Sequence, residues 1–192
     1  MANKDILTPK FRVSFPKLFK VDTYGDSPSF SVVMLFDEAA QKTTEFLEMK
    51  AAAKALITER WPDPAKRPAG IRNPFRDGSE RANIAGYRAG IIFVTAKMKE
   101  EFGRPQVVDR DGQDVLNQRD IYPGCYARAV VSPFVYENKS KGVSFGLSLV
   151  QKIADGEPLG AGGDKRSMLT DLPDDESAGA ATGGADDESW SE

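Results

Sequence analysis

The chain of 192 residues contains no histidine and a single cysteine, Cys125. Without imidazole groups it has no Ser-His or Cys-His catalytic pair, no HExxH metal site and no side chain that ordinarily transfers protons near neutral pH. One cysteine makes neither an intrachain disulfide nor a zinc site built from cysteines, and it is compatible with a reducing cytoplasm. An enzyme with this composition would depend on carboxylates, lysine, tyrosine or that one thiol.

Long hydrophobic segments are also missing. No run of about 18 apolar residues occurs, and no apolar segment near Met1 has the form of an export signal. We therefore expect neither insertion into a membrane nor export. Hydrophobic residues still make up 40% of the chain, which is enough for most of it to bury a core.

Basic residues are absent after Arg166, whereas eight acidic residues follow it. Residues 1–166 hold all 26 lysines and arginines and the other 21 of the 29 acidic residues, so this part carries a net charge of +5 and the remainder −8. The overall charge of −3 hides this division. A basic body with an acidic tail is typical of proteins that bind a polyanion.

The acidic tail ends in D-D-E-S-W-S-E at 186–192. From 161 onward alanine, glycine, serine and acidic residues dominate, which is the composition of a disordered segment. Trp190 has no apolar neighbours with which to form a core. We interpret the tail as a binding site for protein partners and as a competitor of nucleic acid for the basic surface. The residues expected to contact partners are Asp186, Asp187, Glu188, Trp190 and Glu192.

The remaining residues, 1–160, have the pattern of a β-rich domain with one helix. Between 8 and 21 apolar side chains, including Phe11, Val13 and Phe15, alternate with polar ones, which predicts a strand with one apolar face. An apolar segment at 29–36 predicts a strand buried on both faces. Apolar residues at helical spacing over 38–60, after Asp37 as N-cap, predict a helix. Further strands are expected at 87–97, 125–136 and 142–153, with tight turns at 109–112 and 138–142.

These strands do not alternate regularly with helices. A small closed β-barrel with an added helix is therefore favoured over a layered βαβ fold.

The strand C-Y-A-R-A-V-V-S-P-F-V-Y at 125–136 has rings and an arginine on one face and small apolar side chains on the other. Bases of a single strand stack on rings, while arginine contacts phosphate or stacks itself. An ordinary core or a dimer interface fits the same rings equally well, and Pro133 would disturb the alternation if it introduced a bulge. The residues of the mixed face are Tyr126, Arg128, Phe134 and Tyr136.

The loop R-N-P-F-R-D-G-S-E-R at 72–81 places arginines on both sides of an aromatic ring, as in a nucleotide clamp. A surface loop with Phe75 turned inward is an equal alternative. Lys139 and Lys141 at the tip of the last hairpin are in reach of phosphate, although a solvated turn is slightly favoured. Acidic residues with no specific metal-binding spacing are Asp77, Glu80, Asp109 and Asp111, and the segment D-R-D-G-Q-D at 109–114 lacks the spacing of a calcium loop.

The segment at 122–160, which begins Y-P-G-C-Y-A-R-A-V-V-S-P-F-V-Y and ends A-D-G-E-P-L-G, resembles the C-terminal core of a family of bacteriophage single-stranded DNA-binding proteins. The block N-P-F-R-D-G-S-E at 73–80 is similar to another block of that family, and the opening T-P-K-F-R, the helix and the late hairpin occur in the same order. The resemblance implies an OB-fold body that binds single-stranded DNA without catalysis in phage replication and recombination. The acidic tail with an aromatic residue near its end is similar to the tails of other bacterial and phage proteins of this function.

We therefore expect a mainly β protein, with an OB-fold-like small barrel and one added α-helix over 1–160 and a disordered acidic tail over 161–192. It is expected to coat single-stranded DNA in the cytoplasm of a bacterial host with little sequence preference and no cofactor or metal. The tail is expected to recruit replication or recombination proteins. Expected electrostatic contacts are Lys10, Arg12, Arg72, Arg76, Arg88, Arg128, Lys139 and Lys141. Expected stacking contacts are Phe75, Tyr87, Tyr126, Phe134 and Tyr136.

Two alternatives differ in class from a DNA-coating protein. In a protein-interaction or scaffolding barrel the rings would be buried in a partner. In a carboxylate-dependent nuclease Mg²⁺ would be required. An exposed strand edge would also allow a homodimer.

Overall fold

The computed structural model describes residues 4–23 and 27–160 of the chain. The predicted disordered tail over 161–192, including Asp186, Asp187, Glu188, Trp190 and Glu192, lies outside the described residues. Within the described ranges, no helix is long and apolar enough to cross a membrane.

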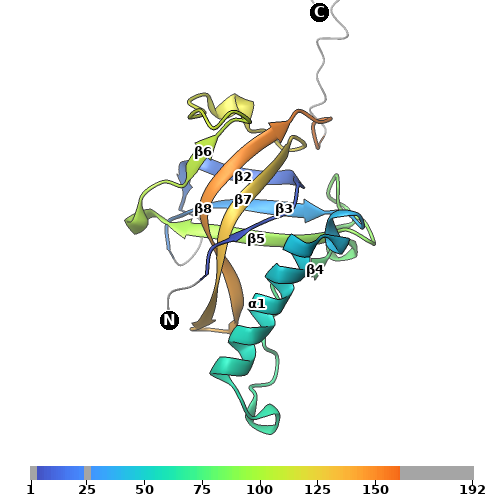
Figure 1. Ribbon diagram of the computed structural model, residues 1–192, viewed down its shortest axis with the longest axis vertical. Helices are drawn as coiled ribbons and strands as arrows, with labels where there is room; N and C mark the ends of the chain where they lie inside the picture. The colour runs from blue at the N-terminus through green and yellow to red at the C-terminus, as the bar shows by residue number, and fades with distance from the viewer. Residues whose placement is uncertain (1–3, 24–26, 161–192) are drawn as a thin grey trace, which may run out of the picture.

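Long strands curl around one another to form the body of the molecule (Figure 1). Their bounds are β2 (Phe11–Asp22), β3 (Ser29–Phe36), β5 (Ile92–Lys99), β7 (Tyr126–Glu137) and β8 (Lys141–Ala154). Strands β2, β3 and β5 form an antiparallel meander, β8 lies parallel to β5, and β7 pairs antiparallel with both β8 and β2. This order makes a partly closed OB-like barrel and confirms the predicted fold class.

Shorter elements are attached to this barrel. Strand β1 (Ile6–Leu7) pairs with β7, β4 (Arg76–Asp77) with β5, and β6 (Gln106–Val108) runs parallel to β8. The 3₁₀ turns are η1 (Ala40–Lys42), η2 (Pro64–Lys66), η3 (Gly78–Arg81), η4 (Glu100–Phe102) and η5 (Gln118–Asp120).

Helix α1 (Thr44–Arg60) begins later than the sequence pattern predicts. Its N-cap is Thr43, whose Oγ1 accepts a hydrogen bond from the backbone N of Phe46 at 3.3 Å. Asp37, the predicted cap, accepts instead from the backbone N of Ala40, the first residue of turn η1, at 2.8 Å. The prediction of Asp37 as the N-cap is therefore wrong, because the helix begins one turn later, after Thr43.

The apolar stripe of α1 covers one end of the barrel, where Figure 1 shows the helix running along the β7–β8 hairpin. Phe46, Met49 and Ala53 are buried, as the helical spacing predicts. The Phe46 ring lies 5.0 Å from the Phe36 ring and 5.5 Å from the Phe75 ring, both in edge-to-face contact. Burial of each large side chain stabilises the fold by about 1.5–3 kcal/mol, so this stripe fixes the helix to the barrel.

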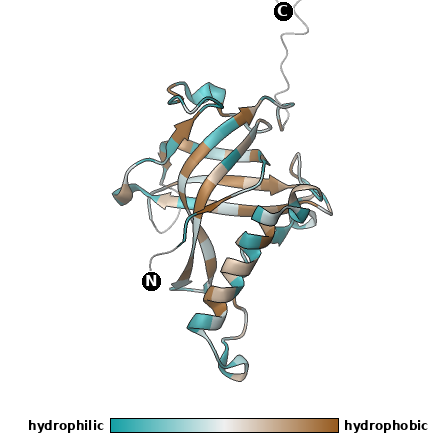
Figure 2. Cartoon of the chain, in the orientation of Figure 1, coloured by the Kyte–Doolittle hydropathy of each residue, from teal (hydrophilic) through white to brown (hydrophobic). Residues whose placement is uncertain are grey.

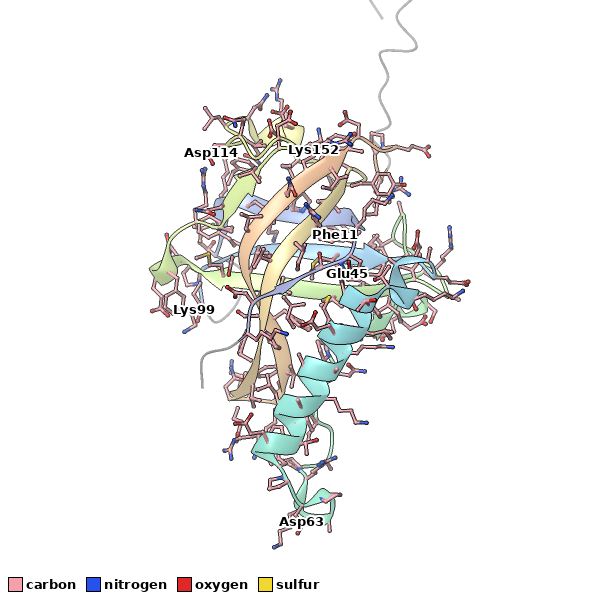
Figure 3. All side chains as sticks on the ribbon, viewed as in Figure 1. Phe11, Glu45, Asp63, Lys99, Asp114 and Lys152 are labelled. Atoms are coloured by element: carbon pink, nitrogen blue, oxygen red, sulfur yellow. The ribbon has the colours of Figure 1, made fainter. Side chains whose placement is uncertain are left out.

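The barrel interior is filled by alternate residues of each strand, and Figure 2 shows the alternation of apolar and polar residues along the strands. Phe11, labelled in Figure 3, is 1% exposed and contacts the Phe36 ring at 5.8 Å. Strand β3 is buried on both faces except at Ser31, as predicted. Its inward residues Val32 and Met34 join the main core.

A second apolar cluster explains the burial of the outer face of β3. Val33, Leu35 and Phe93 are covered there by Tyr87 and Ile91 from the loop before β5. The predicted strand at 87–97 therefore begins too early, because its first residues form this covering loop and pairing starts at Ile92.

Candidate nucleic-acid interface

Strand β2 contains a β-bulge that turns a phenylalanine outward. Ser14 pairs with Val33 and Lys17 with Ser31, so two residues of β2 stand opposite one residue of β3. Phe15, the first of the two, has φ of +43° and is 47% exposed. The alternating pattern placed Phe15 with the core residues, and this prediction is wrong because Pro16 interrupts the ladder.

Beside this bulge lies an open groove of about 1070 Å³, which we name the main groove. Its floor is the outer face of β3 and β5, and its sides come from β2, the loop at 72–76 and the β7–β8 hairpin. The charged and aromatic residues that line it are Phe15, Lys17, Arg72, Phe75, Arg76, Glu80, Arg81, Phe93, Lys97 and Tyr136.

The charge of the main groove is strongly positive. Five cationic side chains line it against one carboxylate, that of Glu80, which gives a net charge of +4. Arg76 is bound to Glu80, with its Nε 3.0 Å from Glu80 Oε2, and Lys17 Nζ lies 2.5 Å from Asp22 Oδ2. Within the described ranges, no side-chain hydrogen bond or ion pair engages Arg72 or Lys97. Both cations are available to an anionic ligand.

The rings of the groove differ in how much surface they offer. Phe75 is half-buried and packs edge-to-face between the rings of Phe46 and Phe145, at 5.5 and 5.8 Å, while still lining the groove. Phe93 is 1% exposed and lies beneath the guanidinium groups of Arg76 and Arg81, at 5.1 and 4.7 Å. The two arginines therefore form a cationic layer over a buried ring.

Arg72 is held in position by the edge of β8. Its backbone N donates to Lys141 O at 2.9 Å, and its O accepts from Val143 N at 3.3 Å. A Cβ on Gly142 would lie 2.8 Å from both Arg72 O and the Tyr136 hydroxyl. A glycine is required at this position because the loop and the tyrosine approach the strand so closely.

A second depression of about 410 Å³, the side pocket, contains four other predicted contacts: Lys10, Arg12, Arg88 and Tyr126. Lys10 Nζ lies 5.3 Å from the centre of the Tyr126 ring. Arg12 is already engaged, because its Nη2 donates to Glu157 O at 2.6 Å and its Nε to Gly124 O at 3.3 Å. Arg12 thus anchors the segment after β8 to the barrel.

The remaining predicted contacts line neither hollow. Tyr87 is 4% exposed and its hydroxyl donates to Ser14 Oγ at 3.1 Å, so it supports the groove from beneath rather than offering a ring face. Arg128 lies near the start of β7, and its Nε donates to Gln151 Oε1 at 2.8 Å. Phe134 is half-buried and pairs with Ser144. Lys139 and Lys141 lie in and beside the exposed hairpin turn.

The alternation predicted for β7 is present in the structure. Ala127, Ala129, Val131 and Pro133 are buried, whereas Tyr126, Arg128, Phe134 and Tyr136 lie on the other face. The register shifts of this hairpin leave an extra residue in β8, so Pro133 does not disturb the pattern of β7. The mixed face is nevertheless divided, since Tyr136 lines the main groove and Tyr126 the side pocket.

The cationic and aromatic residues of the main groove that are not among the predicted contacts are Phe15, Lys17, Arg81, Phe93 and Lys97. Pro16 inside an apparent strand was the signal for the bulge that exposes Phe15. The alternation of Thr95 and Lys97 with buried Val94 and Ala96 was the signal for Lys97.

Two of the carboxylates considered for a nuclease, those of Asp77 and Asp109, accept hydrogen bonds from nearby backbone N–H groups. Asp77 accepts from the backbone N of Ser79 at 2.8 Å, and hydrogen bonds from the side chain and backbone of Ser79 lower the pKa of Asp77. Asp109 Oδ1 accepts from the backbone N of Asp111 and of Gln113, both at 2.9 Å. Across 4–23 and 27–160, no group of three or more acidic, cysteine or histidine side chains is arranged to hold a metal ion.

Comparison with known proteins identifies the relatives of this chain. The family model of the single-stranded DNA-binding protein of Enterobacter phage Enc34 matches residues 4–178. Putative protein p50 of Acyrthosiphon pisum secondary endosymbiont phage 1 is 34% identical over 160 residues, which cover 79% of this chain and 84% of that protein.

Solved structures agree with the barrel described above. The single-stranded DNA-binding protein from bacteriophage Enc34 in complex with ssDNA superposes with a TM-score of 0.69 at 21% identity, over 81% of this chain and 89% of that one. The gp2.5 protein, a single-stranded DNA binding protein encoded by bacteriophage T7, gives a TM-score of 0.59 at 15% identity over 95% and 100% of the two chains. These likenesses show a shared fold, and the family match confirms the resemblance found in the sequence. The chain belongs to the family of the Enterobacter phage Enc34 single-stranded DNA-binding protein.

Proposed function

We propose that this protein is a non-catalytic single-stranded DNA-binding protein that coats exposed strands during phage DNA replication and recombination in the host cytoplasm. The observation that carries the proposal is the main groove, an open channel with a net charge of +4 and exposed aromatic surface. The family to which the chain belongs supports it.

The groove favours single strands for a physical reason. Phosphates of any nucleic acid are attracted by Arg72 and Lys97, but stacking on Phe15 or Tyr136 needs a base whose face is free. Each base stacked on a ring contributes about 1–3 kcal/mol, and a duplex hides those faces between neighbouring base pairs. Because every base has such a face, little sequence preference is expected.

The acidic tail is proposed to regulate this groove and to recruit partners. Eight acidic residues and no basic residue follow Arg166, and their charge is opposite to that of the groove. Removal of 167–192 should tighten DNA binding and weaken binding to replication or recombination proteins. Neutralising Asp186, Asp187 and Glu188 to amides should tighten DNA binding alone, and Trp190→Ala should weaken partner binding alone. Unchanged DNA affinity after deletion would contradict the competition.

A homodimer through a strand edge also stays a proposal. Among the described residues β1 pairs with β7 alone, and Leu7 at this edge is 42% exposed. Light scattering during size-exclusion chromatography tests it, and a monomer mass at all protein concentrations would remove it.

The test of the DNA-binding function is fluorescence anisotropy of labelled oligo-dT over a salt series. The three groove cations without a carboxylate partner among the described residues, Arg72, Arg81 and Lys97, would give a log–log slope of affinity against salt of about −2, at about 0.7 per phosphate neutralised. An excess of duplex should compete poorly. An absence of binding at low salt would overturn the proposal and favour a protein-interaction barrel.

One substitution locates the binding site. Lys97→Ala should weaken binding several-fold and reduce the magnitude of the salt slope by about 0.7, since one phosphate contact is lost. Lys54→Ala is the matched control, because Lys54 is an exposed lysine on α1 away from the groove. Equal effects of the two substitutions would show that binding does not use the main groove.

A further inference from the structure

A third hollow shares two residues with the main groove. This end pocket of about 660 Å³ is formed by the bulge of β2 and the segment 117–123, and its lining includes Phe15, Lys17, Arg119 and Tyr122. Phe15 and Lys17 line both hollows. The segment follows Asp114, which Figure 3 places at the end of the barrel remote from Asp63 and helix α1. The main groove and the end pocket therefore meet at Phe15.

The backbone conformation of Phe15 lowers the stability of the folded protein. A bulky side chain with φ of +43° is strained, and the following Pro16 restricts this residue further. Phe15 is 47% exposed, and the centre of its ring lies 6.5 Å from that of the Tyr87 ring. Tyr87 is itself held in place by the hydrogen bond from its hydroxyl to Ser14 Oγ. Strained residues held by their surroundings in this way are concentrated at ligand-binding sites.

The end pocket is positively charged. Lys17 and Arg119 line it, and no acidic side chain does so among the described residues. The backbone N of Arg119 donates to Asn117 Oδ1 at 3.0 Å, whereas its guanidinium has no ion pair or side-chain hydrogen bond within 4–23 and 27–160. Of the two cations, Arg119 is free to bind an anion, while Lys17 already contacts Asp22.

The wall that carries Arg119 is anchored to the end of β8. The Tyr122 hydroxyl lies 3.0 Å from Gly156 O and 3.1 Å from Asp155 Oδ1, and it accepts from Gly156 N at 3.1 Å. Burial and the contact with Asp155 raise the pKa of Tyr122, so the hydroxyl keeps its proton. The segment is thus a fixed surface, and Arg119 projects from it.

We propose that a bound single strand leaves the main groove across Phe15 and continues into the end pocket, where one base stacks on Phe15 and the next phosphate contacts Arg119. This inference rests on the proposed DNA-binding function and adds a second subsite to it. The occupant is the continuation of the same strand, because both hollows share Phe15 and Lys17 and both are cationic.

A length series tests the second subsite. OB folds occupy roughly 4–16 nucleotides, so oligo-dT of about 4 to about 16 nucleotides covers ligands that fill one hollow and ligands that fill both. Arg119→Ala should bind the shortest oligonucleotides with the same affinity as the unaltered protein. For longer oligonucleotides its affinity should be several-fold lower than that of the unaltered protein. Its salt slope on long oligonucleotides should be smaller in magnitude by about 0.7. The matched control is Arg110→Ala, an exposed arginine that lines neither hollow.

Substitution of Phe15 tests the stacking contact. Phe15→Leu should lose about 5- to 150-fold in affinity for long oligonucleotides, whereas Phe15→Tyr, which keeps a ring, should bind normally. Phe102→Leu serves as control, since Phe102 is 69% exposed and lies outside the grooves. Circular dichroism melting confirms that each variant is folded.

The outcomes separate the two proposals. If the unaltered protein binds every length but Arg119→Ala matches Arg110→Ala throughout, the end pocket is not a subsite, whatever the effect of Phe15→Leu, because Phe15 also lines the main groove. If the unaltered protein binds no oligonucleotide at low salt, both proposals are overturned together.

Discussion

The packing of Phe46 leads to a prediction that joins stability to the binding surface. Phe46 is 0% exposed and contacts two rings, that of Phe36 in the barrel wall and that of Phe75 beside the main groove. Replacing a buried phenylalanine with alanine costs about 3–5 kcal/mol through lost burial and the cavity that remains. Two edge-to-face ring contacts disappear as well, so Phe46→Ala should lie near the upper part of this range.

Leu47, the next residue of the helix, is the matched control. It is 55% exposed, so Leu47→Ala should change the free energy of unfolding by about 0.5 kcal/mol or less. Urea titration followed by circular dichroism gives both values from the transition midpoints and slopes. A loss below about 1 kcal/mol for Phe46→Ala, or equality with Leu47→Ala, would refute the assignment of α1 as the cover of the barrel end.

The same variant has a second readout in DNA binding. Phe75 is held between Phe46 and Phe145, so the Phe46→Ala cavity frees one side of a groove ring. Oligo-dT affinity, measured where the variant is still folded, should fall several-fold, because a ring that must be ordered on binding costs conformational entropy. Unchanged affinity in a folded variant would mean that Phe75 acts as core alone.

The remaining predictions concern single sites. Gly142→Ala should weaken DNA binding in anisotropy measurements, because the new methyl group would lie 2.8 Å from Arg72 O and displace the loop; normal affinity would mean that the loop accommodates it. Burial raises the pKa of Cys125, so a thiol reagent should react at pH 8 only as fast as the protein opens, and rapid reaction of folded protein would contradict this packing. The Lys152 ammonium lowers the pKa of Asp155. The small contribution of this ion pair to stability is therefore present above the ordinary aspartate pKa of 3.8 and is lost as pH falls through the lower pKa of the folded protein. Asp155→Asn should slightly reduce the acid dependence of the melting temperature, and an increase would contradict the ion pair.

Regular alternation made much of the barrel predictable. The bounds of β3 agree with the apolar segment at 29–36, and the last hairpin was found from two alternating runs around a turn. The stripe of Phe46, Met49 and Ala53 predicted the buried face of the helix. In each case one local periodicity determined which side chains face the core, so no tertiary information was needed.

Prediction was wrong where a single residue changed the local geometry. Phe15 left the core face because the ladder is broken before Pro16. The helix begins at Thr44 because Asp37 bonds to Ala40 in a separate turn and Thr43 caps the helix. Tyr87 belongs to a covering loop, although it precedes an apolar run that resembles the start of a strand. The main groove itself combines residues from β2, β5, the 72–76 loop and β7, and no sequence spacing connects those segments.

The unequal lengths of the ladders that close the barrel affect the shape of the main groove when DNA is bound. Strand β5 joins β8 only where Ala96 faces Phe145 and Lys97 faces Gly146, whereas β7 and β8 pair along their whole length. The meander and the hairpin are thus joined by short ladders, two residue pairs between β5 and β8 and two between β2 and β7, and the main groove has one wall on each of these two parts. A DNA strand that contacts Lys97 of the meander and Tyr136 of the hairpin would bridge these two parts of the barrel. The width of the channel would then be set by the nucleic acid as much as by the protein.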